Sequence, residues 1–309
     1  MCARHAQTAF DALLVNPLFK GEILLDEPMA KHTTFRIGGP ARYFARVGSL
    51  GALKHLLAAC AESDVAWYVA GRGSNLLVSD SGFDGVVITL GHDFMNFRYD
   101  EDTQRFYAGG GVLLSTLVQD SFRRCLAGLE FLVDTPGTVG GALSMNAGTS
   151  TDYIGAQVES VTLLDAQQEL IRLDKDELLW GYRKSSFAPD EVIVECELAA
   201  TPADPFYIRG KMEAFRSRRR KTQPLGVASC GSMFINPPDA SAGKLIEQAG
   251  CKGLSVGGAC VSDVHANFII NDGRATADDV VALIELVQMK VFECYGVKLK
   301  PEVRFLGFA

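Results

Sequence analysis

The 309-residue sequence lacks the features that mark several large classes of protein. It has no apolar run long enough to cross a bilayer, and its first residues, MCARHAQTAFDALL, lack the continuous apolar core of a signal peptide. It has no internal repeat and no low-complexity tract. Its eight cysteines are scattered without a CxxC pair, which argues against a zinc site or a secreted disulfide framework. We therefore expect a cytoplasmic globular protein with reduced cysteines, no metal site and no membrane insertion.

The sequence also lacks the positive charge of a general nucleic-acid binder. Its formal net charge is −7, so we expect no nucleic-acid partner. One exception is FRSRRRKTQP, residues 215–224, where five cations follow an apolar stripe with helical spacing. Such a run is typical of the solvent-exposed end of a helix, and it can also hold a phosphate group. The proline at 224 ends this predicted helix.

Helical and strand-like patterns alternate over residues 1–205. Ser49 is placed to cap a helix that runs to Cys60, and a second helix is expected from Val112 to about Leu126. Short β-rich runs lie between and after them. The proline-bearing segment TPADP, residues 201–205, is typical of a domain boundary.

The remaining residues predict a smaller region of mixed structure. A short helix is expected in AGKLIEQAG, residues 242–250, followed by strands in LSVGGACV and ANFIIN. A long amphipathic helix then begins after the cap Thr276 and ends at Gly296. The pattern is α+β with two domains.

Glycine gathers at two places in the first region, GRGSN (71–75) and PGTVGGALSMNAG (136–148). The first loop follows a strand, but the sixth position of the dinucleotide fingerprint is Leu76 and no sustained helix follows, which argues against a Rossmann helix. One such loop is most simply a tight turn. Two amide-rich loops suit a pyrophosphate, which needs hydrogen-bond donors and close approach of the backbone. An extended dinucleotide is therefore a good candidate ligand.

Four further motifs occur in order along the chain: HTTFRIGGPARYF (32–44), YRKSSF (182–187), CGSMFINP (230–237) and PEVRFLG (301–307). With the glycine loops, they resemble the UDP-N-acetylenolpyruvoylglucosamine reductases of bacterial peptidoglycan synthesis, in the form that lacks an extra tyrosine-bearing loop. The resemblance implies an FAD-binding domain of the vanillyl-alcohol oxidase (PCMH) type over residues 1–205. It also implies a smaller α+β substrate-binding domain over 206–300 and a C-terminal segment, 301–309, that returns to the active site.

The family is NADPH-dependent, holds FAD non-covalently, and reduces UDP-N-acetylglucosamine enolpyruvate to UDP-N-acetylmuramate. The resemblance implies that Arg183 binds the substrate carboxylate, that Ser232 donates a proton, and that Glu302 is the catalytic glutamate. Taken alone, these residues have plainer interpretations as a surface ion pair, a turn serine and an exposed carboxylate. Cys230 is expected to be a small packing residue, because hydride transfer needs no nucleophile.

The resemblance also implies binding residues for FAD and for the sugar nucleotide. The FAD contacts are Gly71, Arg72, Gly73, Ser74, Asn75, Leu76, Pro136, Gly137, Thr138, Gly140, Gly141, Asn146, Ala147, Gly148 and Arg304. The substrate contacts are Tyr182, Lys221, Asn236 and His265. Arg220 is an alternative to Lys221, and His265 fits equally well as a core histidine with satisfied hydrogen bonds. The chain departs from the family at Ile235, often lysine, and at Asp134, often glycine.

Two other functions remain open on these residues. The chain fits another FAD-linked oxidoreductase of the same superfamily, or a non-catalytic binder of FAD or a UDP-sugar. The joint presence of Arg183, Ser232 and Glu302 argues against a binder, and the motifs of the second region argue against a generic oxidase. We expect a monomer, although the sequence does not fix the oligomeric state.

Overall fold

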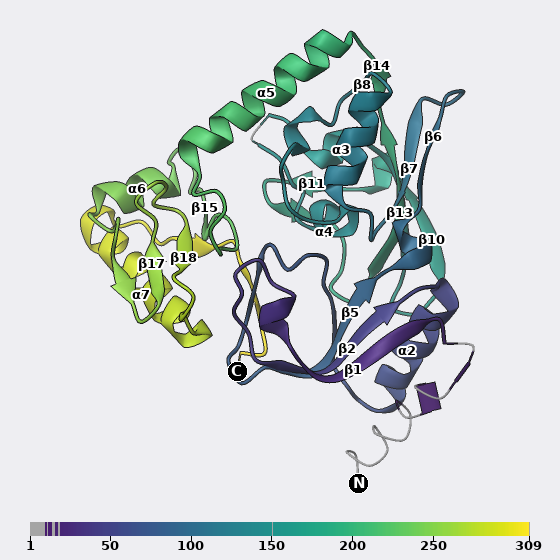
Figure 1. The fold of residues 1–309 in the computed structure, drawn as a ribbon, viewed down its shortest axis with the longest axis horizontal. Coiled ribbons are helices and arrows are strands. Elements are labelled where there is room, and N and C mark those ends of the chain that lie inside the picture. The colour runs from purple at the N-terminus through teal and green to yellow at the C-terminus, as the bar shows by residue number, and fades with distance from the viewer. Residues whose placement is uncertain (1–9, 11, 14–15, 18, 150, 309) are drawn as a thin grey trace. The chain divides into compact units, whose positions relative to one another are not determined.

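The computed structural model describes residues 10, 12–13, 16–17, 19–149 and 151–308 (Figure 1). Residues 1–9 lie outside the described residues. They include Cys2 and most of the N-terminal segment that we expect not to be a signal peptide. The chain divides into two compact units. Unit 1 comprises residues 1–25, 43–71 and 85–216, and unit 2 comprises 26–42, 72–84 and 217–309. Each unit is thus built from three separate segments of the chain. The expected domains, 1–205, 206–300 and 301–309, are by contrast continuous segments, and they stay a prediction.

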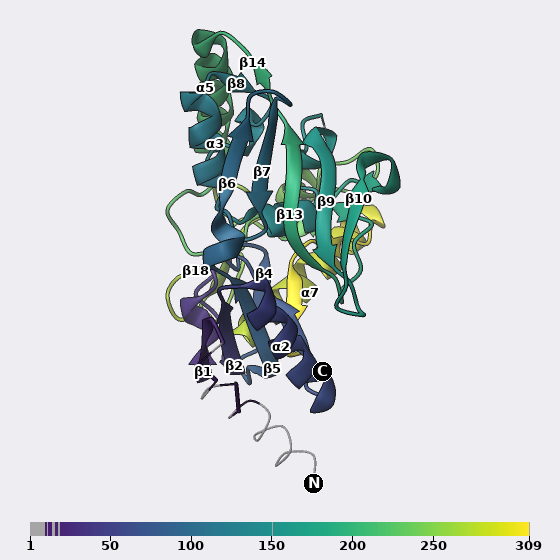
Figure 2. The same ribbon diagram turned by 90° about the vertical axis from the view of Figure 1, so that its right-hand side faces the viewer.

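The main sheet of unit 1 has five antiparallel strands in the order β10-β9-β13-β7-β6, side by side in Figure 2. Their bounds are Phe97–Asp100 (β6), Arg105–Gly109 (β7), Val158–Leu164 (β9), Leu170–Asp174 (β10) and Val192–Ala199 (β13). Helices α3 (Leu114–Arg123) and α4 (Val139–Ser144) belong to the same unit. The predicted helix near residues 112–126 is thus confirmed as α3.

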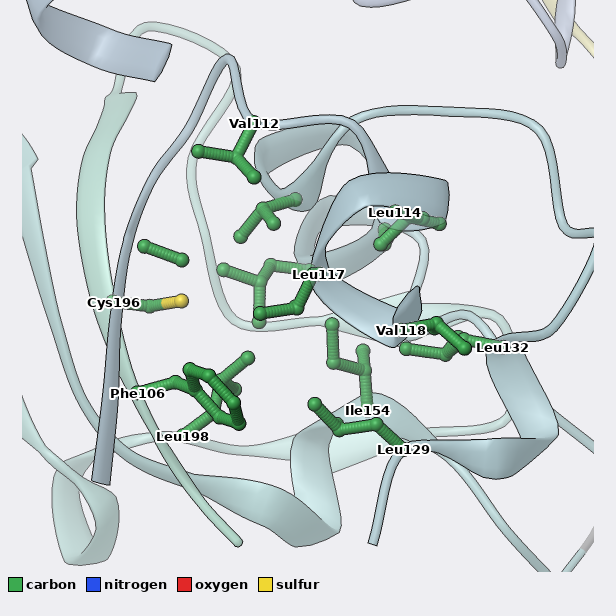
Figure 3. Packing of buried hydrophobic residues seen from close by; sticks show 14 of the residues in the cluster. Phe106, Val112, Leu114, Leu117, Val118, Leu129, Leu132, Ile154, Cys196 and Leu198 are labelled. Carbon is green, nitrogen blue, oxygen red and sulfur yellow. The ribbon is translucent and has the colours of Figure 1, made fainter. Parts of the chain in front are cut away.

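Large apolar side chains fill the core between this sheet and α3. Phe106 of β7, Leu117 of α3 and Leu198 of β13 are fully buried and lie in one cluster (Figure 3). Burial of each such side chain contributes about 1.5 to 3 kcal/mol before the entropy of ordering is subtracted. This core supports α4 as well, because Val139 and Leu143 belong to the same cluster.

A second sheet has the strand order β1-β2-β5-β3, with β1 Gly21–Pro28, β2 Pro40–Val47, β5 Phe83–Leu90 and β3 Trp67–Val69. Helix α2, Leu50–Glu62, shares a buried cluster with it, to which the helix residues Leu53 and Leu56 and the strand residues Val86 and Ile88 belong. Ser49 Oγ accepts a hydrogen bond from Ala52 N at 3.2 Å, so the predicted cap is confirmed.

Unit 2 combines two short strand pairs, a three-stranded sheet and two helices. Strand β4 (Leu76–Val78) pairs in parallel with β20 (Arg304–Leu306), and β15 (Phe234–Ile235) pairs antiparallel with β19 (Lys300–Pro301). The three-stranded sheet holds β16 (Ser255–Val256), β17 (Ala259–Val261) and β18 (Ile269–Asn271). Helices α6 (Ala242–Gln248) and α7 (Ala277–Tyr295) complete the unit.

Helix α7 begins and ends as the sequence predicts. Thr276 Oγ1 accepts from Asp279 N at 3.1 Å, and the Asp279 carboxylate accepts in turn from Thr276 N at 3.0 Å, a capping box. Gly296 follows the helix with a φ of 68°, a left-handed conformation that glycine adopts without steric cost. Val280, Ile284, Val287 and Val291 are buried along one face.

Helix α5, Pro205–Thr222, carries the basic run in its last turns. Asp204 Oδ1 accepts hydrogen bonds from Phe206 N and Tyr207 N, which starts the helix.

The remaining elements are β8 Leu126–Ala127, β11 Trp180–Gly181, β12 Lys184–Ser185, β14 Thr201–Pro202, and the 3₁₀ turns Met29–Lys31, His92–Met95, Glu130–Leu132, Ile154–Gln157 and Lys175–Glu177. Within the described residues, no helix combines the length and the apolar character that a membrane span requires.

Candidate active site

A two-residue hairpin turn in unit 1 carries Tyr182 and Arg183 between β11 and β12. Arg183 has a φ of 55°, an uncommon conformation for a residue with a side chain. Tyr182 is 46% exposed, whereas Arg183 is half-buried, and its guanidinium carbon lies 5.3 Å from the tyrosine ring centroid. The turn therefore presents an aromatic ring and a cation together.

The hairpin is fastened to the second glycine loop. Arg183 Nη1 donates to Gly148 O at 2.9 Å, and Asn146 Nδ2 donates to Gly181 O at 2.8 Å. Asn146 is buried, and its Oδ1 also accepts from Gly155 N at 3.1 Å. The Asn146 carboxamide thus ties three segments together, and the loop fixes the direction of the Arg183 side chain.

The two glycine loops meet in unit 1 at Gly71 and Thr138. A Cβ atom on Gly71 would lie only 2.5 Å from Thr138 Oγ1, so this approach requires glycine. Thr138 Oγ1 also accepts from Gly141 N at 3.4 Å, and Thr138 is the N-cap of α4. Thr138 thus caps a helix, and the loops that are separate in sequence come into direct contact.

Several backbone amides of these loops are left for a ligand. In the described part of the chain, no hydrogen bond to a protein acceptor leaves the amides of residues 71–73 or those of Gly137 and Thr138. The next two amides, of Val139 and Gly140, donate by contrast to carbonyl groups of residues 110 and 112. Unused amides on glycine-rich backbone fit the phosphate groups of a dinucleotide.

In unit 2, Ser232 and Glu302 lie on neighbouring segments. Glu302 N donates to Met233 O at 2.8 Å, directly after Ser232, and Ser232 itself forms an isolated β-bridge with Phe268. Both Ser232 and Glu302 are half-buried. Two backbone segments separated by 70 residues of sequence, one with a serine and the other with a glutamate, are thus neighbours, while Arg183 belongs to unit 1.

The first glycine loop adjoins the segment that carries Glu302. Asn75 Nδ2 donates to Glu302 O at 3.1 Å, and Arg304 N donates to Asn75 O at 3.0 Å. Arg304 stands opposite Leu76 in the parallel register of β20 and β4, and its side chain is exposed. Two of the predicted FAD residues, Asn75 and Arg304, therefore lie beside a predicted catalytic residue.

The predicted substrate residues of unit 2 have different surroundings. Lys221 is exposed in the last turn of α5, and Asn236 is exposed with its Oδ1 accepting from Ala242 N at 2.9 Å. His265 is half-buried, and its Nδ1 accepts from Asn267 N at 3.1 Å. Burial lowers the pKa of the His265 imidazole, which favours its neutral form. The His265 ring is thus a hydrogen-bonded, half-buried group of unit 2, and its part in substrate binding stays a prediction.

The three remaining positions that the sequence singled out have local explanations. Cys230 is 2% exposed, and burial raises the pKa of its thiol to about 12, so it packs rather than reacts. Asp134 has a φ of 55°, a conformation that glycine adopts readily, and its carboxylate lies 3.3 Å from Arg216 Nε. Ile235 stands opposite the exposed Lys300 in the register of β15 and β19, so a cation is present one strand away.

Sequence reasoning missed Asn267, which is 4% exposed and hydrogen-bonded to the strand after Ser232. A polar residue within the apolar run ANFII was the available signal. A buried polar group of this kind needs partners, and those partners are 33 residues away in sequence.

Family comparisons now define the class of protein. Residues 41–174 match the model of an FAD binding domain, and residues 223–306 match that of the UDP-N-acetylenolpyruvoylglucosamine reductase C-terminal domain. The chain is thus an FAD-binding protein of two parts, a flavin domain joined to a family-specific second domain.

Relatives extend the match to nearly the whole chain. The UDP-N-acetylenolpyruvoylglucosamine reductase of Heliobacterium modesticaldum is 42% identical over 94% of this chain and 92% of its own length. That of Clostridioides difficile is 39% identical over 95% of this chain and 96% of its own. The crystal structure of the Thermus caldophilus enzyme superposes with a TM-score of 0.81 at 34% identity, over 93% of this chain and 99% of that one.

The chain therefore belongs to the UDP-N-acetylenolpyruvoylglucosamine reductase family. This membership confirms the predicted family and the predicted α+β fold, with its FAD-binding domain and its second domain. It also confirms that the protein is an oxidoreductase and that its cofactor is FAD.

Proposed function

We propose that this protein reduces UDP-N-acetylglucosamine enolpyruvate to UDP-N-acetylmuramate with NADPH, and that Arg183, Ser232 and Glu302 carry the chemistry. The observation that supports this assignment is the bond from Glu302 N to Met233 O, which sets the Glu302 segment beside Ser232. We assign residues 1–205 to FAD binding, 206–300 to substrate binding and 301–309 to the segment that supplies Glu302. The protein acts in the cytoplasm as a monomer.

The two glycine loops hold FAD through the amides that the protein leaves unused. The other proposed contacts come from the exposed Arg72 and Arg304, whose guanidinium groups suit a diphosphate. Bound there, FAD would supply the hydride chemistry that links NADPH to the terminal enol carbon of the substrate.

Addition of hydride to the enolpyruvyl group places negative charge on the neighbouring carbon and on the carboxylate. A planar guanidinium binds a carboxylate with two parallel hydrogen bonds, and Arg183 takes this role. Its bond to Gly148 O at 2.9 Å holds the guanidinium in one direction, so little reorganisation is needed as charge develops.

The reaction then requires a proton on the neighbouring carbon. Ser232 Oγ delivers this proton, and Glu302 orients the hydroxyl. A hydroxyl is a weak acid, so this role depends on placement within hydrogen-bond reach of the reacting carbon. The hydrogen bond between the Glu302 and Met233 backbones, one residue from Ser232, supports this role.

The rest of the substrate is held by residues outside this centre. Lys221 and its neighbours bind the diphosphate, while Tyr182 and Asn236 contact the sugar nucleotide. For His265, Nδ1 is taken by Asn267 N, so Nε2 is the atom that contacts the substrate.

The test separates the two half-reactions with Ser232→Ala. Reduction of bound FAD by NADPH should proceed near the wild-type rate, because it needs no proton at the enol carbon. Reoxidation by the enolpyruvyl substrate should slow by about 100-fold to 10,000-fold, the usual cost of losing a positioned general acid. Stopped-flow absorbance of the flavin follows each half, with Ser255→Ala, an exposed serine of β16, as the matched control.

Two outcomes contradict the proposal. If folded holoprotein is not reduced by NADPH, the proposed function is wrong. If Ser232→Ala reoxidises at the wild-type rate, Ser232 is a turn residue and the proton comes from another group.

A further inference from the structure

Among the described residues, the strand that follows Ser232, β15, pairs with one other strand, β19, along one of its edges. Phe234 stands opposite Pro301 in the antiparallel register, and Glu302 N donates to Met233 O. In this register Phe234 and Pro301 form a non-hydrogen-bonded pair, so the Phe234 amide and carbonyl face the opposite edge. Proline is tolerated at position 301 for the same reason, because no donor is needed there.

The Asn267 side chain occupies that opposite edge. Its Oδ1 accepts from Phe234 N at 2.9 Å, and its Nδ2 donates to Phe234 O at 2.8 Å. Its backbone carbonyl accepts from Met233 N at 2.7 Å. The Asn267 carboxamide therefore makes the two hydrogen bonds that a neighbouring strand would make. It satisfies the backbone amide and carbonyl of Phe234, which is 2% exposed.

Asn267 is itself held in place. Its amide donates to His265 Nδ1 at 3.1 Å, and the next residue, Phe268, forms the bridge with Ser232. The His265 and Phe268 rings pack with centroids 5.0 Å apart. Ser232 is thus flanked on the chain by Met233, which donates to Asn267 O, and across the bridge by Phe268, the residue that follows Asn267.

We propose that Asn267 is a positioning residue for the proton donor Ser232, which it sets at a fixed place relative to Glu302. The inference rests on the proposed function, because it takes Ser232 as the donor. Asn267 touches neither substrate nor cofactor in this role. It acts through the backbone, and a misplacement of about 1 Å at a reacting group can cost roughly 100-fold in rate.

The variant Asn267→Asp tests the proposal with little change of shape. Aspartate keeps the acceptor for Phe234 N, but its second oxygen cannot donate to Phe234 O when ionised. Reduction of FAD by NADPH should stay within about 2-fold of wild type. Reoxidation by the enolpyruvyl substrate should slow by roughly 10-fold to 100-fold, and its solvent deuterium isotope effect should rise as proton transfer becomes limiting.

Asn271→Asp is the matched control. Asn271 also spans the chain with its carboxamide: Nδ2 donates to Phe35 O at 3.0 Å, and Oδ1 accepts from Gly273 N at 2.7 Å. It makes no side-chain bond to the strand of Ser232 among the described contacts, so both half-reactions should keep their rates. If Asn267→Asp fails to retain FAD, Asn267→Ser serves instead, because a hydroxyl replaces one of the two bonds to Phe234.

A double-mutant cycle with Ser232→Ala distinguishes positioning from general structural damage. If Asn267 acts through Ser232, the Asn267 substitution should slow reoxidation no further once the hydroxyl is gone. The inference would be overturned if the two substitutions multiplied their slowing of reoxidation in the double variant, or if Asn267→Asp reoxidised at the wild-type rate. Either result would leave the proposed function standing. A wild-type rate in Ser232→Ala alone would instead overturn the serine assignment and this inference with it.

Discussion

The first glycine loop offers a sharp test of why glycine is required at one position. Gly73 has a φ of 60°, and a Cβ atom there would lie 2.3 Å from His32 O and 2.8 Å from Thr33 Cα. Both neighbours are backbone atoms, so no side-chain rotation can relieve the contact. The substitution Gly73→Ala must therefore move one of two backbone segments.

The expected loss of stability has two parts. A left-handed conformation costs alanine about 1 to 2 kcal/mol, and overpacking of a rigid site typically costs about 1 to 3 kcal/mol. A central value near 3 kcal/mol corresponds to a fall in Tm of roughly 5 °C, because an unfolding entropy of about 2.1 cal/mol/K per residue sums to about 0.65 kcal/mol/K over 309 residues. The shift also displaces the unused amides of residues 71–73, so affinity for FAD should fall with it.

Gly210→Ala is the matched control, because it makes the same chemical change where nothing opposes it. Gly210 lies inside α5, and no atom lies within 4 Å of a Cβ added there. Alanine should stabilise the helix by about 0.5 to 1 kcal/mol. Thermal unfolding by circular dichroism and retention of FAD on gel filtration measure both variants. A Gly73→Ala protein with the Tm and FAD content of wild type would refute the reasoning.

The remaining predictions concern pH and substrate affinity. Burial raises the pKa of Glu197, but hydrogen bonds from Arg172 and Arg105 outweigh this effect and hold the pKa of the folded state below the usual 4.5. The ionised carboxylate therefore stabilises the fold fully above pH 4.5. This contribution to the free energy of unfolding should be lost as the pH falls through the pKa of the folded state. Denaturant unfolding from pH 6 to pH 3 should show this loss in wild type and a shallower slope in Glu197→Gln, and equal slopes would contradict it. Lys221→Ala should raise KM for the UDP-sugar by roughly 10-fold to 100-fold with kcat little changed, since a charge-assisted contact to diphosphate acts in ground and transition states alike. A raised KM for NADPH instead would assign the basic run to the other substrate.

Local rules of the chain fixed much of the secondary structure. The caps at Ser49, Thr138 and Thr276 and the glycine at 296 lie within a few residues of the backbone groups that they satisfy. Hydrogen bonds over so short a span depend on residue type and spacing, which a sequence displays directly. The order of the motifs also identified the family, because a comparison of motifs along the chain needs no knowledge of which residues are close in space.

The tertiary structure decided which of these motifs meet. The sequence placed Gly71 and Thr138 in two loops, but only the fold brings them within a contact that excludes a Cβ atom. It likewise could not show that Arg183 donates to Gly148 O, or that Asn75 donates to Glu302 O from 227 residues away. Contacts of this range arise from the packing of whole sheets and cores, not from local conformational preference.

The role of Asn267 shows the same limit most clearly. The sequence offered one polar residue in an apolar strand, and its type alone allows a surface position, a turn or a buried network. The register of β15 and β19 leaves the Phe234 amide and carbonyl without a partner on β19. The need for another hydrogen-bond partner therefore arises only once these strands are paired. The sequence by itself determined the elements, the family and the cofactor. Tertiary structure decided which backbone groups those elements left unsatisfied, because hydrogen-bond partners are settled only when distant segments pack.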